Sequence, residues 1–190
     1  MASPRGLVPA VEHAGFCVND SQVVCEYLAD VYPGTLLPTD AQEKARVRIF
    51  WEHVSSQVIP FFYRMLMGKD EESRTEARDK LLAGLRHAND LMSAASPSGC
   101  FLGPGRYSLA DLALSPWWFR IPVVLGTYRQ FRLPDEGAEF ARLRSWWGEV
   151  SERASFKRTL VSEDRLVRNY AEYADGSATS EVARTLAPSK

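Results

Sequence analysis

The stretch SLADLALSPWWFR, residues 108–120, decides the fold of this chain. Ser108 is followed three residues later by Asp111 at the start of an apolar run, which is the pattern of a helix capping box with Asp in the place of Glu. The helix that this box opens is apolar almost all the way round, as is typical of a helix buried on every side. We therefore expect the central helix of an all-α bundle here, kinked or ended by Pro116 and Pro122.

Helical patterns continue on both sides of this segment. Apolar residues at helical spacing predict three further long helices, at about 40–67, 71–96 and 135–151. Pro60 should kink the first of them. Ser155 and Ser162 have the character of caps for two short final helices.

The beginning of the chain has a different residue pattern, which favours strands rather than helices. The segment LVPAVEHAGFCVN, residues 7–19, places strand-forming residues around a tight turn at 13–15, which predicts a small β-hairpin. A helix begins at Ser21, just after Asp20, and ends at the Tyr-Pro-Gly sequence of 32–34. The predicted fold class is mainly α, with one hairpin and one helix ahead of the helical bundle.

The charge of the chain is nearly balanced, with 23 Lys and Arg against 24 Asp and Glu. This excludes a strongly basic nucleic-acid binder and a polybasic membrane anchor. Cys17, Cys25 and Cys100 show no metal-ligand spacing, so we expect no metal site and a reducing, cytoplasmic location. We also expect Cys17 and Cys25 to be buried as small hydrophobic residues and Cys100, in a Gly/Pro loop, to be the more exposed.

Several segments together resemble the glutathione transferase superfamily, and its fungal omega-like members in particular. The matching stretches are PRGLVPA at 4–10, NDSQVVCEYL at 19–28, SLAD at 108–111, RASFK at 153–157 and YAEYA at 170–174. The resemblance implies a partial thioredoxin-like, glutathione-binding domain at 1–34, a linker at 35–39, an all-α C-terminal domain at 40–175 and a flexible tail at 176–190.

The resemblance also implies where glutathione would bind as co-substrate. In the family, the residue before a cis-proline pairs its backbone with the cysteinyl part of glutathione, and this position is Val8, before Pro9. The N–H and hydroxyl of Ser21 would hold the γ-glutamyl carboxylate at a helix N-terminus. Asp20 would hold the ammonium group; the family usually has the longer Glu there, so this contact would be longer or water-mediated.

Each of these assignments has a simpler alternative. Asp20 and Ser21 also fit plain helix capping, which needs no ligand. Aromatic residues on two helices are core residues by default. In the family, the same two helices bind the apolar co-substrate. The pocket residues predicted on that basis are Trp51, Phe62, Trp118 and Arg120.

The family pattern begins here at residue 4, so the resemblance implies that the preceding unit, which carries the catalytic Cys, Ser or Tyr, is absent. The catalytic residue is therefore unknown. We expect a glutathione transferase-like protein that conjugates, reduces or isomerises a small electrophilic or aromatic metabolite, in fungal secondary metabolism or detoxification. It would be an enzyme only if the preceding unit is present or compensated, and a homodimer as is usual in the family. The alternative is a non-catalytic helical binding module.

Overall fold

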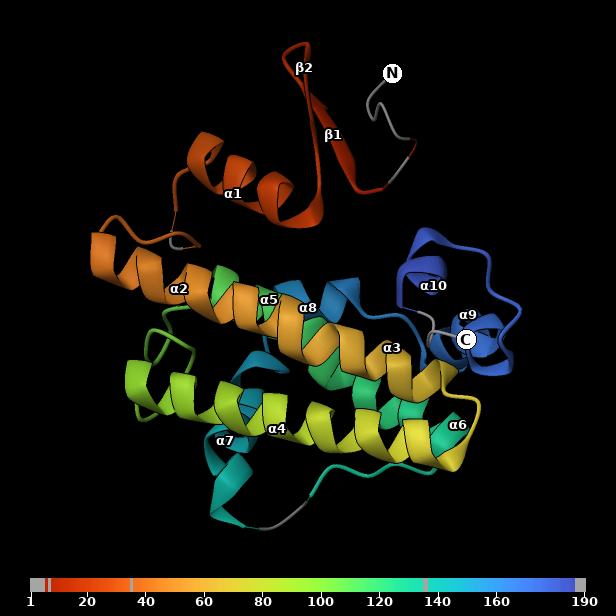
Figure 1. Cartoon of the computed structure of the whole chain (residues 1–190). Helices are drawn as coiled ribbons and strands as arrows, with labels where there is room; N and C mark the ends of the chain where they lie inside the picture. The colour runs from red at the N-terminus through yellow and green to blue at the C-terminus, as the bar shows by residue number, and fades with distance from the viewer. Residues whose placement is uncertain (1–5, 7, 35, 135–136, 187–190) are drawn as a thin grey trace.

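The structure is a computed structural model, and it describes residues 6, 8–34, 36–134 and 137–186. Two parts follow one another along the chain (Figure 1). The first is a β-hairpin with one helix, and the second is a body of packed helices. This arrangement confirms the predicted fold class.

The hairpin is a two-stranded antiparallel sheet. Strand β1 spans Ala10–His13 and β2 spans Phe16–Asn19. The two residues between them, Ala14 and Gly15, have φ angles of 51° and 79°, and positive φ at both positions is what a type I′ hairpin turn requires. Helix α1, Ser21–Val31, follows directly and packs on the strands.

Helix α1 is also joined to the helical body. Glu26 of α1 accepts two hydrogen bonds from Arg48 of α2, Ala41–His53, at 3.2 and 2.6 Å. The Arg48 guanidinium lowers the pKa of Glu26. Beyond α1, Leu109 donates its N–H to the carbonyl of Leu36 at 2.8 Å, which ties the connecting segment to the start of the central helix.

The predicted helix at 40–67 is one rod interrupted by a π-helical turn. Helix α2 runs into η1, Val54–Val58, and then into α3, Ile59–Met67. Pro60 lacks the N–H that would continue the α-helical ladder, so a wider turn just before it is the expected distortion. The kink predicted at Pro60 is therefore a π turn at 54–58.

The central helix forms where the sequence predicts it. Helix α5, Leu109–Arg120, opens with a capping box between Ser108 and Asp111, and seven of its residues are buried. Its rod continues through a second π turn, η2 at Ile121–Leu125, which contains Pro122, into the short α6, Gly126–Arg129. Pro122, like Pro60, thus lies close to the point where the backbone hydrogen bonds change from α-helical to π-helical spacing.

The remaining helices complete the body. They are α4, Glu71–Ala95; η3, Ala138–Phe140; α7, Ala141–Val150; α8, Ala154–Thr159; α9, Glu163–Asp175; and α10, Glu181–Leu186. Ser162 caps α9, as predicted, by accepting from the Arg165 N–H. Ser155 is not a cap, because α8 begins one residue before it, after Arg153.

Helix α10 lies inside the segment 176–190, for which the sequence predicts a flexible tail. Ala183 of this helix is buried and belongs to the core cluster, so part of the tail is helical and packed. The segment is polar, and its pattern of residues does not predict a helix. Residues 187–190 lie outside the described residues.

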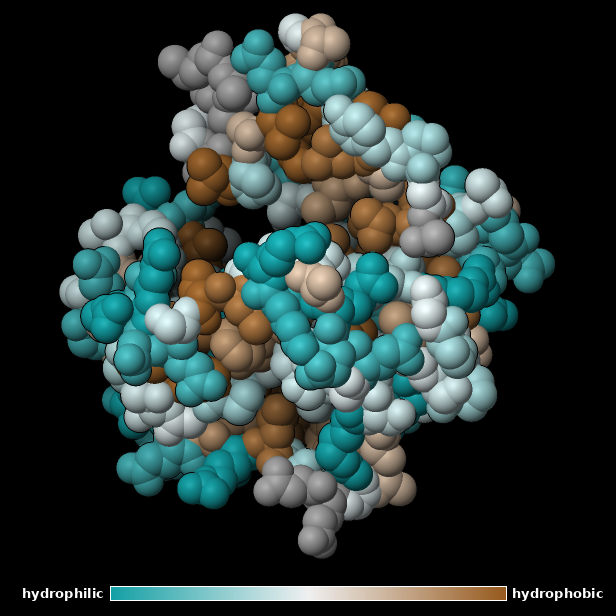
Figure 2. Space-filling model, turned by 180° about the vertical axis from the view of Figure 1, so that it is seen from behind, coloured by the Kyte–Doolittle hydropathy of each residue, from teal (hydrophilic) through white to brown (hydrophobic). Residues whose placement is uncertain are grey.

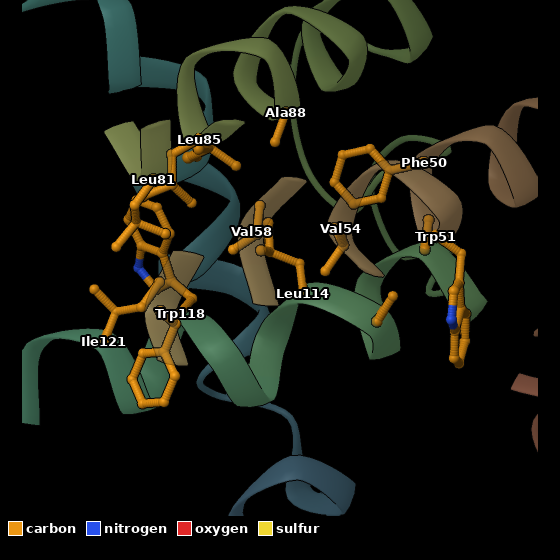
Figure 3. Packing of buried hydrophobic residues seen from close by; sticks show 14 of the residues in the cluster. Phe50, Trp51, Val54, Val58, Leu81, Leu85, Ala88, Leu114, Trp118 and Ile121 are labelled. Atoms are coloured by element: carbon orange, nitrogen blue, oxygen red, sulfur yellow. The ribbon is translucent and has the colours of Figure 1, made fainter. Parts of the chain in front are cut away.

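One apolar core joins the helices of the body. On the face seen from behind, hydrophobic residues are also visible among the hydrophilic ones (Figure 2). Figure 3 shows side chains of the α2–η1 rod, α4 and α5 meeting in the core. Phe50, Val54, Leu85 and Leu114 among them are fully buried. Burial of this kind is the main driving force for folding. The helical body therefore supports the hairpin and α1, which contact it through the Arg48–Glu26 ion pair.

Candidate functional site

The N-terminus of α1 is capped but not fully satisfied. Asp20, with a φ of 76°, accepts hydrogen bonds at one carboxylate oxygen, Oδ1, from the N–H groups of Gln22 at 3.0 Å and Val23 at 3.3 Å. Among the described residues, none pairs with the N–H or hydroxyl of Ser21 or with Oδ2 of Asp20. A helix start with a free N–H can bind a carboxylate.

The hairpin register brings the two predicted halves of the glutathione site together. Ala10 pairs with Asn19, so Pro9 and Asp20 continue from the same end of the sheet. The peptide bond between Val8 and Pro9 is cis, as predicted. Val8 is 91% exposed, and Pro9, Asp20 and Ser21 are exposed as well.

The four predicted pocket residues do not share one site. Phe62 is 0% exposed and belongs to the core, so it has no surface to offer a ligand and its assignment is corrected. Trp51 is also buried. Trp118 and Arg120 line two different cavities, because residues two apart on an α-helix point about 200° apart.

The cavity at Trp118 measures about 800 Å³ and lies between the η2–α6 segment and the loop that follows it. The cavity at Arg120 measures about 590 Å³ and lies between α5 and α8. The second cavity also contains Tyr107 and Arg153, which the sequence analysis did not select. Arg153 stands in the RASFK match, but it comes just before α8, and no pattern around it indicates a neighbour on α5.

The cysteines differ from expectation at two positions. Cys17 is exposed rather than buried. Cys100 is buried rather than exposed, and its Sγ donates to Glu149 at 3.2 Å. Burial raises the pKa of the Cys100 thiol to about 12, so the thiolate is absent at neutral pH. Cys25 is half-buried, and burial raises the pKa of its thiol too.

Two negative findings apply to the described part of the chain. Its residues contain no group of three or more His, Cys, Asp or Glu placed to hold a metal ion. None of its helices combines the length and the apolar character needed to cross a membrane.

Comparison with known proteins identifies the family. No protein-family model matches the chain. It is 30% identical over 121 residues to glutathione S-transferase omega-1 of the pig, Sus scrofa, covering 63% of this chain and 49% of the relative. It is 28% identical over 168 residues to the chloroplastic glutathione S-transferase DHAR3 of Arabidopsis thaliana, covering 88% and 59%.

A solved structure supports the same conclusion over most of the chain. Glutathione transferase Omega 3C from Trametes versicolor superposes with a TM-score of 0.78 and 31% sequence identity, covering 94% of this chain and 74% of that one. The chain belongs to the glutathione transferase superfamily, with omega-class proteins among its relatives. It spans about half the length of the curated relatives it matches.

Proposed function

We propose that the chain binds glutathione at the N-terminus of α1 and is a glutathione transferase-like protein. The observation that carries this proposal is that the N–H and hydroxyl of Ser21 and Oδ2 of Asp20, which lie side by side, have no partner among the described residues. A γ-glutamyl group has a carboxylate for the first and an ammonium for the second. Val8 and Pro9, at the same end of the hairpin, are the contacts proposed for the cysteinyl part.

The proposal also covers the reaction, the oligomeric state and the cellular location. Glutathione would be the co-substrate, and the second substrate a small electrophilic or aromatic metabolite that is conjugated, reduced or isomerised. Of the predicted contacts for that substrate, Trp51, Trp118 and Arg120 remain proposals, and Phe62 is dropped because it has no exposed surface. A homodimer in the cytoplasm, acting in detoxification or fungal secondary metabolism, is part of the same proposal. The names of the relatives support the class of reaction.

The structure supplies a matched pair of variants to test glutathione binding. Asp40 caps α2 as Asp20 caps α1, with Oδ1 accepting from Gln42 and Glu43 at 3.0 and 2.9 Å. We expect Asp20→Ala and Asp40→Ala each to lower the free energy of unfolding by about 1 kcal/mol. Only Asp20→Ala should also weaken the affinity for glutathione, by about tenfold, because it removes a charge-assisted contact.

The measurement is retention on immobilised glutathione with elution by free glutathione, for the wild-type chain and both variants. Equal retention of Asp20→Ala and wild type would show that Asp20 serves only as a cap. A wild-type chain that passes through the column would overturn the proposal and leave the non-catalytic helical module as the account of this protein.

A further inference from the structure

Two histidines meet where α4 crosses the rod formed by α2 and η1. The rings of His53, the last residue of α2, and His87 of α4 lie edge to face with their centroids 4.7 Å apart. His53 is buried, whereas His87 is exposed. Nε2 of His53 lies 2.8 Å from the carbonyl oxygen of Gly84, and because a carbonyl can only accept, this nitrogen carries a proton and donates. The His53 side chain therefore joins the two helices.

The two backbones approach each other closely at this crossing. A Cβ on Gly84 would lie 2.4 Å from the carbonyl oxygen of Gln57 in η1. Val54 of η1 and Ala88 of α4, the residues that follow the two histidines, are fully buried (Figure 3). A charged group in apolar surroundings loses much of its hydration. A charged His53 ring could regain water only if α4 moved away from the rod.

The surroundings of His53 oppose its protonation. The neutral ring donates through Nε2, so a second proton would be placed on Nδ1, which takes part in no hydrogen bond of the described residues. Burial is the main cause that lowers the pKa of His53, and the hydrogen bond to Gly84 acts in the opposite direction. A charge on His87 lowers the pKa further, and Glu52 on the same helix raises it.

The other charged side chains of the adjoining elements are occupied or exposed. Helix α5 also packs on α2 and η1, and its charged residues are Asp111, which accepts from buried donors, and Arg120, which donates to a backbone carbonyl. The π turn η1 contains no charged residue. On α4, Arg86 is paired with an acid, and Asp90 is exposed. Within the described ranges, no carboxylate forms an ion pair with either histidine.

We propose that His53 and His87 form a pH-sensitive contact, which holds α4 against α2 and η1 at neutral pH and releases it in mildly acidic solution. Protonation of His53 places a charge in the apolar crossing, and protonation of His87 adds a like charge beside it. This contact lies within the helical body and does not depend on the proposed glutathione site.

The direction of the pH effect follows from burial. Because burial keeps the pKa of His53 in the folded chain below its ordinary value, the unfolded chain takes up this proton at a higher pH than the folded chain does. The stability that the neutral ring contributes is therefore complete above about pH 6.5 and is lost as the pH falls below that value.

Urea unfolding of the whole chain at about pH 7.5 and about pH 5.5 measures this loss. The wild-type midpoint should be lower at the acidic pH by about 0.5 M. His53→Gln, whose side chain takes up no proton, should lose most of this pH dependence, and His87→Gln should lose part of it. His13→Gln is the matched control, because His13 lies in the hairpin, where it bonds Tyr27, and this variant should keep the wild-type pH dependence.

Hydrogen exchange of the backbone amides distinguishes release of the crossing from a general loss of stability. In the wild-type chain, protection of the α4 amides at 84–88, relative to their intrinsic exchange rates, should fall several-fold at the acidic pH. Amides at 143–150 in α7 should keep their protection, and His53→Gln should show no such difference. His87→Gln guards against a folding defect, because it keeps the buried ring, whose NMR signal should titrate at a higher pH than in the wild type.

Three results would overturn the proposal. They are equal wild-type midpoints at the two pH values, a full wild-type pH dependence in His53→Gln, and unchanged protection of the α4 amides in acid. A failure of glutathione to bind would leave it standing, because none of these measurements involves glutathione.

Discussion

Replacing Asp111 with Ala is expected to lower the free energy of unfolding by about 4 kcal/mol, because it leaves buried donors unsatisfied. The carboxylate is fully buried, and both of its oxygens accept two hydrogen bonds. Oδ1 accepts from the Phe101 N–H at 2.7 Å and the Trp146 indole N–H at 2.8 Å. Oδ2 accepts from the N–H and hydroxyl of Ser108 at 2.7 and 2.9 Å.

The size of this effect follows from what the substitution leaves behind. Four buried donors lose their acceptor at once, and each unsatisfied donor costs far more than the net gain of an ordinary hydrogen bond. The same carboxylate joins the start of α5 to the 101 loop and to α7, so the loss affects three segments. For a chain of this length the midpoint of thermal unfolding should fall by roughly 10 °C.

The matched control is Asp70→Ala. Asp70 caps α4 by accepting from the Ser73 N–H at 2.8 Å, but it is exposed, so its loss should cost only about 1 kcal/mol. Urea unfolding of both variants measures the difference. If Asp111→Ala were no more destabilising than Asp70→Ala, the four hydrogen bonds would not be the main support of the central helix.

Replacing Gly84 with Ala is expected to destabilise the protein by about 2 kcal/mol, although Ala is the better helix former. Gly84 lies in α4 where it meets the π turn η1. A Cβ there would lie 2.4 Å from the carbonyl oxygen of Gln57, which is backbone and has little room to move. The Gly84 carbonyl also bonds His53 Nε2 at 2.8 Å, so any shift of α4 disturbs this contact too.

We expect the opposite effect on stability for Gly148→Ala. Gly148 is also inside a helix, α7, but apart from the helix's own backbone no atom of the described residues lies within 4 Å of the position of its added Cβ. This variant should gain about 0.5–1 kcal/mol, from helix propensity alone. Denaturant unfolding of the two variants should therefore give changes of opposite sign. A stabilised Gly84→Ala would contradict the close packing of α4 on η1.

The elements that the sequence predicts well are those set by local signals. The capping box of Ser108 and Asp111 and the positive-φ turn at Ala14 and Gly15 depend on residues a few positions apart. The two π turns also have a local cause, because Pro60 and Pro122 each lack a backbone N–H donor. None of these features depends on how distant segments pack.

The features that the sequence does not predict depend on packing between distant segments. Helix α5 is apolar nearly all round, so its pattern does not reveal which distant segments line the cavities beside Trp118 and Arg120. Cys100 stands among loop-forming residues, yet it is buried in the core cluster, where its Sγ donates to Glu149 of α7. Arg153 joins the cavity of α5 only through the chain turn between α7 and α8.

The central claim is that glutathione binds at the start of α1, and amide NMR spectra recorded during a glutathione titration test it most directly. The account predicts saturable shifts of the amide signals of Ser21, Gln22 and Val23, with the signals of Gln42 and Glu43 at the equivalent cap of α2 unchanged. Unchanged signals at 21–23 with millimolar glutathione, or equal shifts at both helix starts, would contradict it.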